Sequence, residues 1–146
     1  MKSSMSKKAG FTLVELMVVA IIVALLAAVA IPLMSANRKR AASTEGEAGL
    51  GTIRTALRAV YAEKNAYNVN LNGGGINPGG VVGVVPGIVA GDLEGRYFKD
   101  ASYSIVTIGT TNYSIQVTGT GNGADPVVNG VTITLNQSGV FGYVGL

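Results

Sequence analysis

The sequence predicts an α+β fold in which one long N-terminal helix packs on a small antiparallel β-sheet. Two observations predict the helix: an almost wholly apolar run from Phe11 to Met34, and an apolar stripe at helical spacing beyond it. A third observation, alternation of apolar and polar residues near the end of the chain, predicts the sheet. The expected segments are a basic leader (1–10), a hydrophobic membrane and assembly helix (11–34), an amphipathic helix (35–66), a Gly-rich connector (67–96) and a β-sheet head (97–146).

The apolar run is long enough to cross a bilayer as a helix. Leu16 to Met34 carries no charge, and at about 1.5 Å per residue it reaches roughly 29 Å. The hydrocarbon core of a bilayer is about 30 Å thick. A helix of a soluble core rarely stays apolar on every face for so long. We therefore expect this segment to lie in lipid for at least part of the protein's life.

Helix signals continue beyond the apolar run. Four apolar residues recur at spacings of three, four and three, which predicts one buried stripe on an amphipathic helix. A continuous helix from Phe11 to about Ala66 would be roughly 84 Å long. The four residues of the stripe are Leu50, Ile53, Leu57 and Val60.

Several residues weaken or end this helix. Pro32 removes one backbone hydrogen bond and predicts a kink. Gly46, Gly49 and Gly51 each weaken the helix by up to about 1 kcal/mol. Asn65 and Asn68 are plausible ends. We expect one long, bent helix, half in the membrane and half amphipathic.

Four strands follow from the alternation and the short connectors between them. The connectors predict antiparallel neighbours, and the apolar stripe of the helix would cover one face of the sheet. The predicted strands are Tyr103–Ile108, Tyr113–Thr118, Val131–Asn136 and Val140–Val144.

The segment 68–95 fits no regular element, because it combines many glycines with many valines. A structureless loop of this length is uncommon in a compact domain. A short extra strand near Val81–Val85 would shorten it. Otherwise the segment is either a mobile surface loop or an apolar loop covered by another copy of the protein.

Composition excludes several functions. The chain has no cysteine and no histidine, so a His-based triad, a thiol nucleophile, an ordinary zinc site and a disulfide are all excluded. The net charge of +3 matches the leader lysines Lys2, Lys7 and Lys8, and the rest of the chain is neutral. We therefore expect no nucleic-acid partner. We also expect no enzymatic activity and no cofactor.

The junction between the leader and the apolar run reads KKAGFTLVEL over residues 7–16. A basic leader that ends in Gly10, followed by Phe11, Glu15 and an unbroken apolar helix, closely resembles the bacterial type IV pilin family, including its secretion pseudopilins. The long helix, Gly-rich connector and β-rich head extend the resemblance along the chain. The sequence is most similar to a type IV major pilin precursor, but it lacks the cysteine pair that closes a C-terminal loop in many family members.

The resemblance implies specific roles. A prepilin peptidase and methyltransferase would cleave after Gly10 and methylate the new amine of Phe11. Glu15 would attract the Phe11 amine of a neighbouring subunit, and Pro32 would let the helix bend or unwind in the assembled bundle. The implied partners are further copies of the chain in a helical filament, the peptidase, the inner-membrane pilus assembly machinery and membrane lipid. The precursor would lie in the inner membrane and the product in an extracellular filament.

The physical chemistry of Glu15 agrees with this role. An unpaired carboxylate at the centre of a membrane helix costs roughly 2.5–3.5 kcal/mol. Glu15 lies only about 6 Å along the axis from Phe11, so its cost is lower. The apolar segment offers no basic partner, so we expect one from another chain. The alternative is a carboxylate that reaches the headgroups or is favoured by the helix dipole.

Other interpretations use the same residues. In an ordinary secretory signal, Ala28–Ala30 would be the cleavage site and the mature protein would begin at Ile31. The chain could also be a type II secretion pseudopilin, a minor pilin, or a secreted or membrane-tethered monomeric binding domain. Carboxylates that could bind calcium follow no familiar spacing, and we expect them to be solvated surface charges. They are Asp92, Glu94, Asp100 and Asp125.

Overall fold

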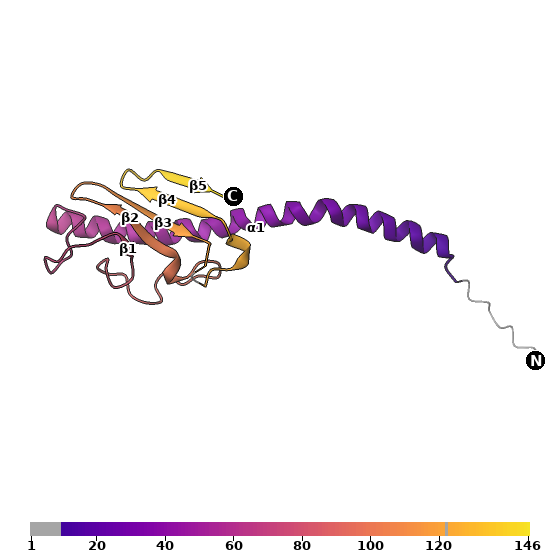
Figure 1. Cartoon of the computed structure of the whole chain (residues 1–146), viewed down its shortest axis with the longest axis horizontal. Helices are drawn as coiled ribbons and strands as arrows, with labels where there is room; N and C mark the ends of the chain where they lie inside the picture. The colour runs from indigo at the N-terminus through magenta and orange to yellow at the C-terminus, as the bar shows by residue number, and fades with distance from the viewer. Residues whose placement is uncertain (1–9, 122) are drawn as a thin grey trace, which may run out of the picture. The chain divides into compact units, whose positions relative to one another are not determined.

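The computed structural model describes residues 10–121 and 123–146, and the predicted leader, apart from Gly10, lies outside them. The chain forms two compact units, one ending at Ser35 and the other beginning at Ala36. One long helix, α1, is followed by a five-stranded sheet with two short 3₁₀ helices at Asp100–Ser102 and Pro126–Val128 (Figure 1). This is the α+β arrangement that the sequence predicts.

Helix α1 runs from Leu13 to Lys64. It continues through Pro32, and the hydroxyl of Ser35 donates a 2.8 Å hydrogen bond to the carbonyl oxygen of Pro32. The helix ends at Asn65, which has a left-handed backbone (φ 54°) and whose N–H donates to the carbonyl of Tyr61. Asparagine tolerates this conformation better than most residues, so it stops the helix at the predicted position.

The sheet has the order β1-β2-β3-β4-β5, and all its neighbours are antiparallel. The second and third strands have the predicted bounds, and the last two begin one residue later than predicted. A bulge interrupts the pairing of β2 with β3 between Ile105 and Thr107. The strands are β1 (Gly79–Gly80), β2 (Tyr103–Ile108), β3 (Tyr113–Thr118), β4 (Thr132–Asn136) and β5 (Phe141–Val144).

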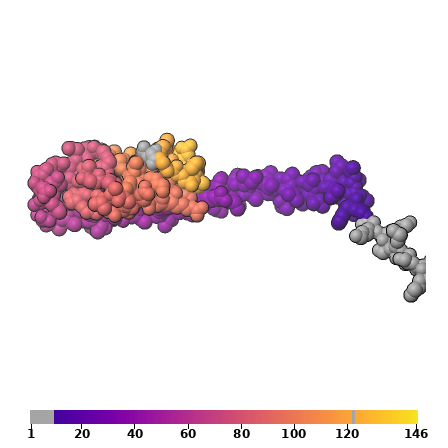
Figure 2. All heavy atoms as spheres, turned by 90° about the horizontal axis from the view of Figure 1, so that it is seen from below, coloured from indigo at the N-terminus to yellow at the C-terminus, as the bar shows by residue number. Residues whose placement is uncertain are grey.

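The structure has a short extra strand next to Val81–Val85, but these five residues are not part of it. The extra strand is the two-residue β1, and the residues after it form turns. Five apolar side chains of the connector, one before β1 and four between β1 and β2, are nevertheless buried in the chain's own core. They therefore do not need a second copy of the protein to cover them. They are Ile76, Val81, Val85, Ile88 and Leu93. In the space-filling view this segment belongs to one continuous surface with its neighbours (Figure 2).

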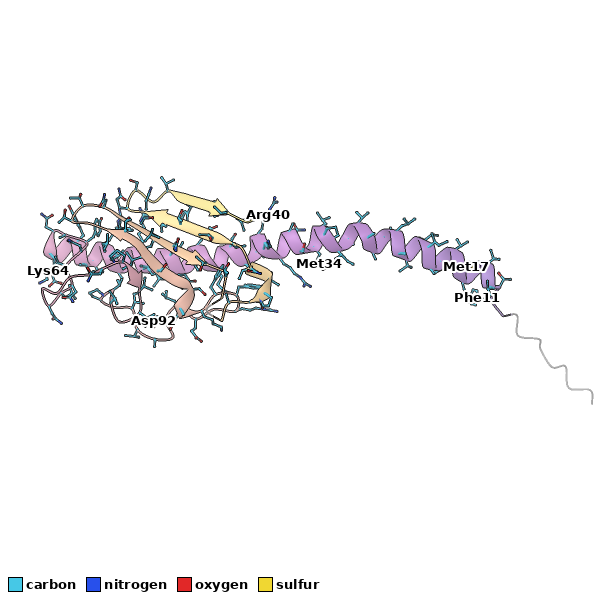
Figure 3. All side chains as sticks on the ribbon, viewed as in Figure 1. Phe11, Met17, Met34, Arg40, Lys64 and Asp92 are labelled. Atoms are coloured by element: carbon cyan, nitrogen blue, oxygen red, sulfur yellow. The ribbon has the colours of Figure 1, made fainter. Side chains whose placement is uncertain are left out.

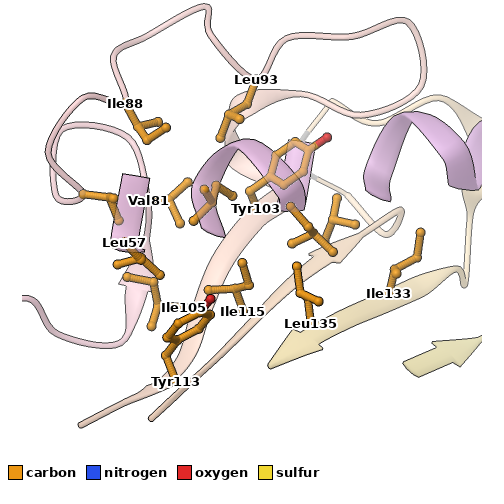
Figure 4. Packing of buried hydrophobic residues seen from close by; sticks show 14 of the residues in the cluster. Leu57, Val81, Ile88, Leu93, Tyr103, Ile105, Tyr113, Ile115, Ile133 and Leu135 are labelled. Carbon is orange, nitrogen blue, oxygen red and sulfur yellow. The ribbon is translucent and has the colours of Figure 1, made fainter. Parts of the chain in front are cut away.

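The predicted stripe of α1 packs on the apolar face of the sheet. Leu50, Ile53 and Leu57 are fully buried, and Val60 is 1% exposed. Figure 4 shows Leu57 among side chains of the connector and of β2, β3 and β4. Burying a side chain of this size contributes about 1.5–3 kcal/mol, so this contact stabilises the unit that begins at Ala36.

Two glycines of α1 let the helix approach the sheet closely. A methyl group on Gly46 would lie 3.0 Å from side-chain carbons of Val117 and Ile133. A methyl group on Gly49 would overlap the ring of Tyr103. Gly51 faces open space. Two of the three glycines expected to weaken the helix are therefore sites of contact with the sheet.

Candidate assembly and membrane-anchoring site

The side chains of the apolar segment of α1 are exposed. Every large apolar side chain from Phe11 to Met34 is at least half exposed, from 50% at Val18 to 84% at Phe11. These side chains project from all sides of the helix (Figure 3). Within the described chain, α1 is the helix whose length and composition suit a membrane span. Exposed apolar surface of this size marks an interaction with lipid or protein.

Glu15 and Thr12 form a capping box at the start of α1. The Glu15 carboxylate accepts hydrogen bonds from the amide (2.9 Å) and the hydroxyl (2.8 Å) of Thr12. The Thr12 hydroxyl in turn accepts the amide N–H of Glu15 at 3.2 Å. This reciprocal arrangement satisfies backbone donors that a helix N-terminus leaves free. Within one chain, Glu15 therefore acts as a residue of the first turn that caps the helix.

Among the residues that the structure describes, the carboxylate of Glu15 nevertheless has no cation beside it. Thr12 is its hydrogen-bond partner among the described residues, and no lysine or arginine occurs between Gly10 and Met34. Around it lie the apolar side chains of Phe11, Val14 and Val18. The site thus combines one negative charge with an apolar surface. Gly10 is exposed and precedes the helix.

A cluster of cations follows the apolar segment. Arg38 and Arg40 are exposed, whereas the Lys39 ammonium group donates a 3.2 Å hydrogen bond to the carbonyl of Gly145. This bond helps to hold the residues after β5 against α1. In a chain without cysteine, this bond attaches the end of the last strand without a disulfide.

The role of Glu45 is not apparent from the sequence. Its carboxylate accepts hydrogen bonds from three consecutive amides, those of Arg96 (3.0 Å), Tyr97 (2.8 Å) and Phe98 (2.8 Å). Glu45 therefore ties α1 to the segment that leads into β2. Its partners are about fifty residues away in the chain, so no local spacing could reveal them. The one signal in the sequence is that Glu45 is a charged residue among helix residues that face the sheet.

The four carboxylates considered for calcium do not assemble into a site. Asp100 accepts the amides of Gly91 and Leu93, and Asp92 and Asp125 each accept one amide nearby in sequence. In the part of the chain that the structure describes, no three acidic side chains are grouped as metal ligands. Three of these carboxylates therefore order loops.

The fold and the exposed segment define a class of protein: a small α+β subunit with an N-terminal helix suited to a membrane and to association with other helices. Comparison with known proteins gives the same class. Residues 5–31 match the prokaryotic N-terminal methylation motif. No solved structure gives a significant match.

Two relatives are similar over longer stretches. The chain is 37% identical over 93 residues to the type IV major pilin protein PilA of Myxococcus xanthus. The aligned stretch covers 62% of this chain and 42% of that protein. It is 35% identical over 72 residues to the competence protein ComGC of Halalkalibacterium halodurans, which covers 49% of this chain and 71% of that protein. The chain belongs to the type IV pilin family, and it is a pilin-like or pseudopilin-like subunit.

Proposed function

We propose that the chain is the structural subunit of a type IV pilus filament. It is made as an inner-membrane precursor, cleaved after Gly10, methylated at the Phe11 amine and polymerised through its N-terminal helix. The observation that carries this proposal is an exposed apolar segment, Phe11–Met34, that bears one carboxylate and no cation. Such a helix is stable outside lipid when other apolar helices surround it. The similarity to the Myxococcus xanthus major pilin supports the same function.

In this proposal, Glu15 exchanges partners during assembly. Cleavage after Gly10 creates a charged amine at Phe11, and Glu15 attracts that amine from the neighbouring subunit. The ammonium group brings a full positive charge to the carboxylate, whereas Thr12 offers it only neutral donors. The amine can therefore displace the capping box.

The assembly role is tested with Glu15→Ala, with Glu63→Ala as the control because Glu63 is an exposed carboxylate on the same helix. Filaments sheared from cells should be lost or strongly reduced in the first variant and normal in the second. Both precursors should still fractionate with membranes. A normal filament yield from Glu15→Ala would falsify the pairing role.

The processing site is tested with Gly10→Lys. We expect uncut precursor to accumulate in the membrane, because the peptidase subsite has no room for a side chain. Mass spectrometry of the wild-type protein should show a methylated Phe11 at the N-terminus. A mature protein that begins at Ile31 would instead establish a secretory signal.

Pro32 is proposed to let the helix bend or unwind inside the filament. Its ring leaves the carbonyl of Ala28 without an intrahelical partner. Pro32→Ala should restore that bond and stiffen the helix. Filaments of this variant should differ in helical rise or in yield, as measured by electron microscopy. Pro32→Ala filaments with the wild-type yield and an unchanged helical lattice would exclude this role.

A second candidate is a pseudopilin of a short periplasmic filament, because the chain is also similar to a family member that is named as a competence protein and not as a major pilin. Electron microscopy separates the two candidates, because a pilus subunit gives abundant long surface filaments. A monomeric membrane-tethered domain would give neither kind of filament, and the mature chain would stay in the detergent-extractable membrane.

A further inference from the structure

Arg54 is a partly buried cation without a counter-charge. Its guanidinium group lies against Gly139, in the turn between β4 and β5, where a methyl group would overlap it. The Nε atom is shielded from water and has no hydrogen-bond partner among the described residues. Taking part of a charged group out of water costs free energy unless an acceptor replaces the water. Arg54 therefore lacks a negatively charged partner.

The surroundings of Arg54 add positive charge. Arg58 lies one turn further along α1 and is exposed. Burial raises the pKa of Tyr113, and both guanidinium groups lie close enough to oppose that rise. Over residues 10–121 and 123–146, the one ion pair within 4.0 Å joins Lys64 to Glu63. No carboxylate of the same chain neutralises Arg54 and Arg58, which we call the arginine pair.

One carboxylate of the described chain is equally without a partner. Glu94 is exposed, and its carboxylate forms neither a hydrogen bond nor an ion pair with the described residues, although its amide donates to the carbonyl of Gly91. The remaining carboxylates bind amides, a threonine, a lysine or, for Glu47, the hydroxyl of Tyr143. These carboxylates belong to Glu15, Glu45, Glu47, Glu63, Asp92, Asp100 and Asp125.

We propose that the arginine pair binds the Glu94 carboxylate of a second copy of this chain. The proposal rests on the proposed filament function and assigns one contact between neighbouring subunits. Two different patches on the same chain form a heterologous contact, which generates an open helical assembly when the rotation does not close. A carboxylate matches the fork of a guanidinium group, with which it forms a charge-assisted pair.

Arg38 and Arg40 are weaker candidates for Glu94. Both are exposed, so water already solvates them, and an exposed ion pair contributes little. Arg54 differs because its guanidinium group is packed against Gly139, so forming an ion pair costs it less side-chain freedom. The charge of a neighbour is therefore worth more at Arg54.

The test reverses each charge and then combines the reversals. Cells that express Arg54→Glu alone or Glu94→Arg alone should show filament yields reduced at least about tenfold, because each variant places like charges together. Arg54→Glu with Glu94→Arg in one chain should restore the yield to within about twofold. Co-expression of the two single variants should also restore filaments, since the reversed patch of one chain then meets the reversed patch of the other.

Two controls make the result specific. Lys64→Glu reverses an exposed charge at the end of the same helix and should leave the yield unchanged. Near-ultraviolet circular dichroism of each detergent-solubilised variant reports whether the head is folded. Recovery of filaments on co-expression shows independently that both variants fold. Asp92→Arg tests the neighbouring carboxylate and should not rescue Arg54→Glu.

Each contrary result has one meaning. Normal filaments from either single variant, or failure of both the double variant and the mixture, would overturn the proposed contact. Rescue by Asp92→Arg would overturn the assignment to Glu94. If the wild-type chain forms no filament, the proposed function fails and not the contact alone.

Discussion

Gly49 of α1 lies so close to the ring of Tyr103 that a methyl group on the glycine would overlap the ring. Tyr103 is 2% exposed and begins β2. The ring therefore has no free space into which it could move. This contact sets how closely α1 approaches the sheet.

Gly49→Ala should destabilise the unit that begins at Ala36 by about 1–3 kcal/mol, because overpacking forces the ring or the helix to shift. Gly51→Ala is the matched control, since Gly51 faces open space on the same helix. It should be neutral or stabilising by up to about 1 kcal/mol. Urea unfolding of the full chain in detergent, followed by tyrosine circular dichroism, measures both. Equal effects of the two substitutions would contradict the close contact.

Glu45→Gln should destabilise the fold by about 1–3 kcal/mol. The amide has one oxygen for three backbone donors, and unsatisfied donors cost free energy. Glu63→Gln, on the exposed side of the same helix, should change stability by less than about 0.5 kcal/mol. Hydrogen exchange should become faster at the amides of Tyr97 and Phe98 in the first variant. Unchanged exchange there would rule out the role of Glu45.

Stability should fall at alkaline pH because of Tyr103. Burial, followed by the charges of Glu45 and Asp100, raises the pKa of the Tyr103 hydroxyl above its ordinary value of about 10. Below about pH 10 both the folded and the unfolded chain hold the proton, so no stability is lost. Above it the unfolded chain loses the proton first, and unfolding becomes more favourable by up to about 1.4 kcal/mol per pH unit.

Tyr103→Phe should weaken this pH dependence while keeping the ring. Unfolding free energies measured between about pH 8 and pH 11.5 give the slope for each protein. Tyr113 contributes a similar loss, since burial also raises its pKa, so the variant should retain part of the slope. Identical slopes in both proteins would show that Tyr103 does not contribute.

Thr12→Ala should loosen the first turn of α1, because a helix cap of this kind contributes about 0.5–2 kcal/mol. Amide exchange at residues 13–16 in detergent micelles should become faster. Thr52→Ala is the control, because the Thr52 hydroxyl bonds to the carbonyl of Ala48 inside the helix. It should leave that first turn unchanged. Protection that survives Thr12→Ala would mean that Glu15 caps the helix without Thr12.

The regular elements could be predicted because local patterns encode them. The alternation of Tyr113, Ile115 and Val117 places all three side chains on one face of the sheet, and all three are buried. The stripe of α1 follows the same logic at helical spacing. Asn65 could be recognised as a helix end from its own backbone preference.

The connector and the contacts of Glu45 could not be predicted in this way. Val81, Val85 and Ile88 are buried from turns, and turns have no repeating pattern of side-chain direction. The bonds of Glu45 join residues about fifty positions apart. Gly46 and Gly49 looked like weak points because helix propensity considers the helix alone. The contribution of these glycines to stability depends on the aromatic and branched side chains that lie opposite them.

Strand β5 is an edge strand held by β4 on one side and, beyond its end, by the bond from Lys39 to Gly145. No covalent bridge secures it, since the chain has no cysteine. Reductants and oxidants in the environment therefore leave its attachment unchanged. Mechanical load is different: a pull on the C-terminal end is opposed only by weak bonds that can open one after another and close again when the tension is released.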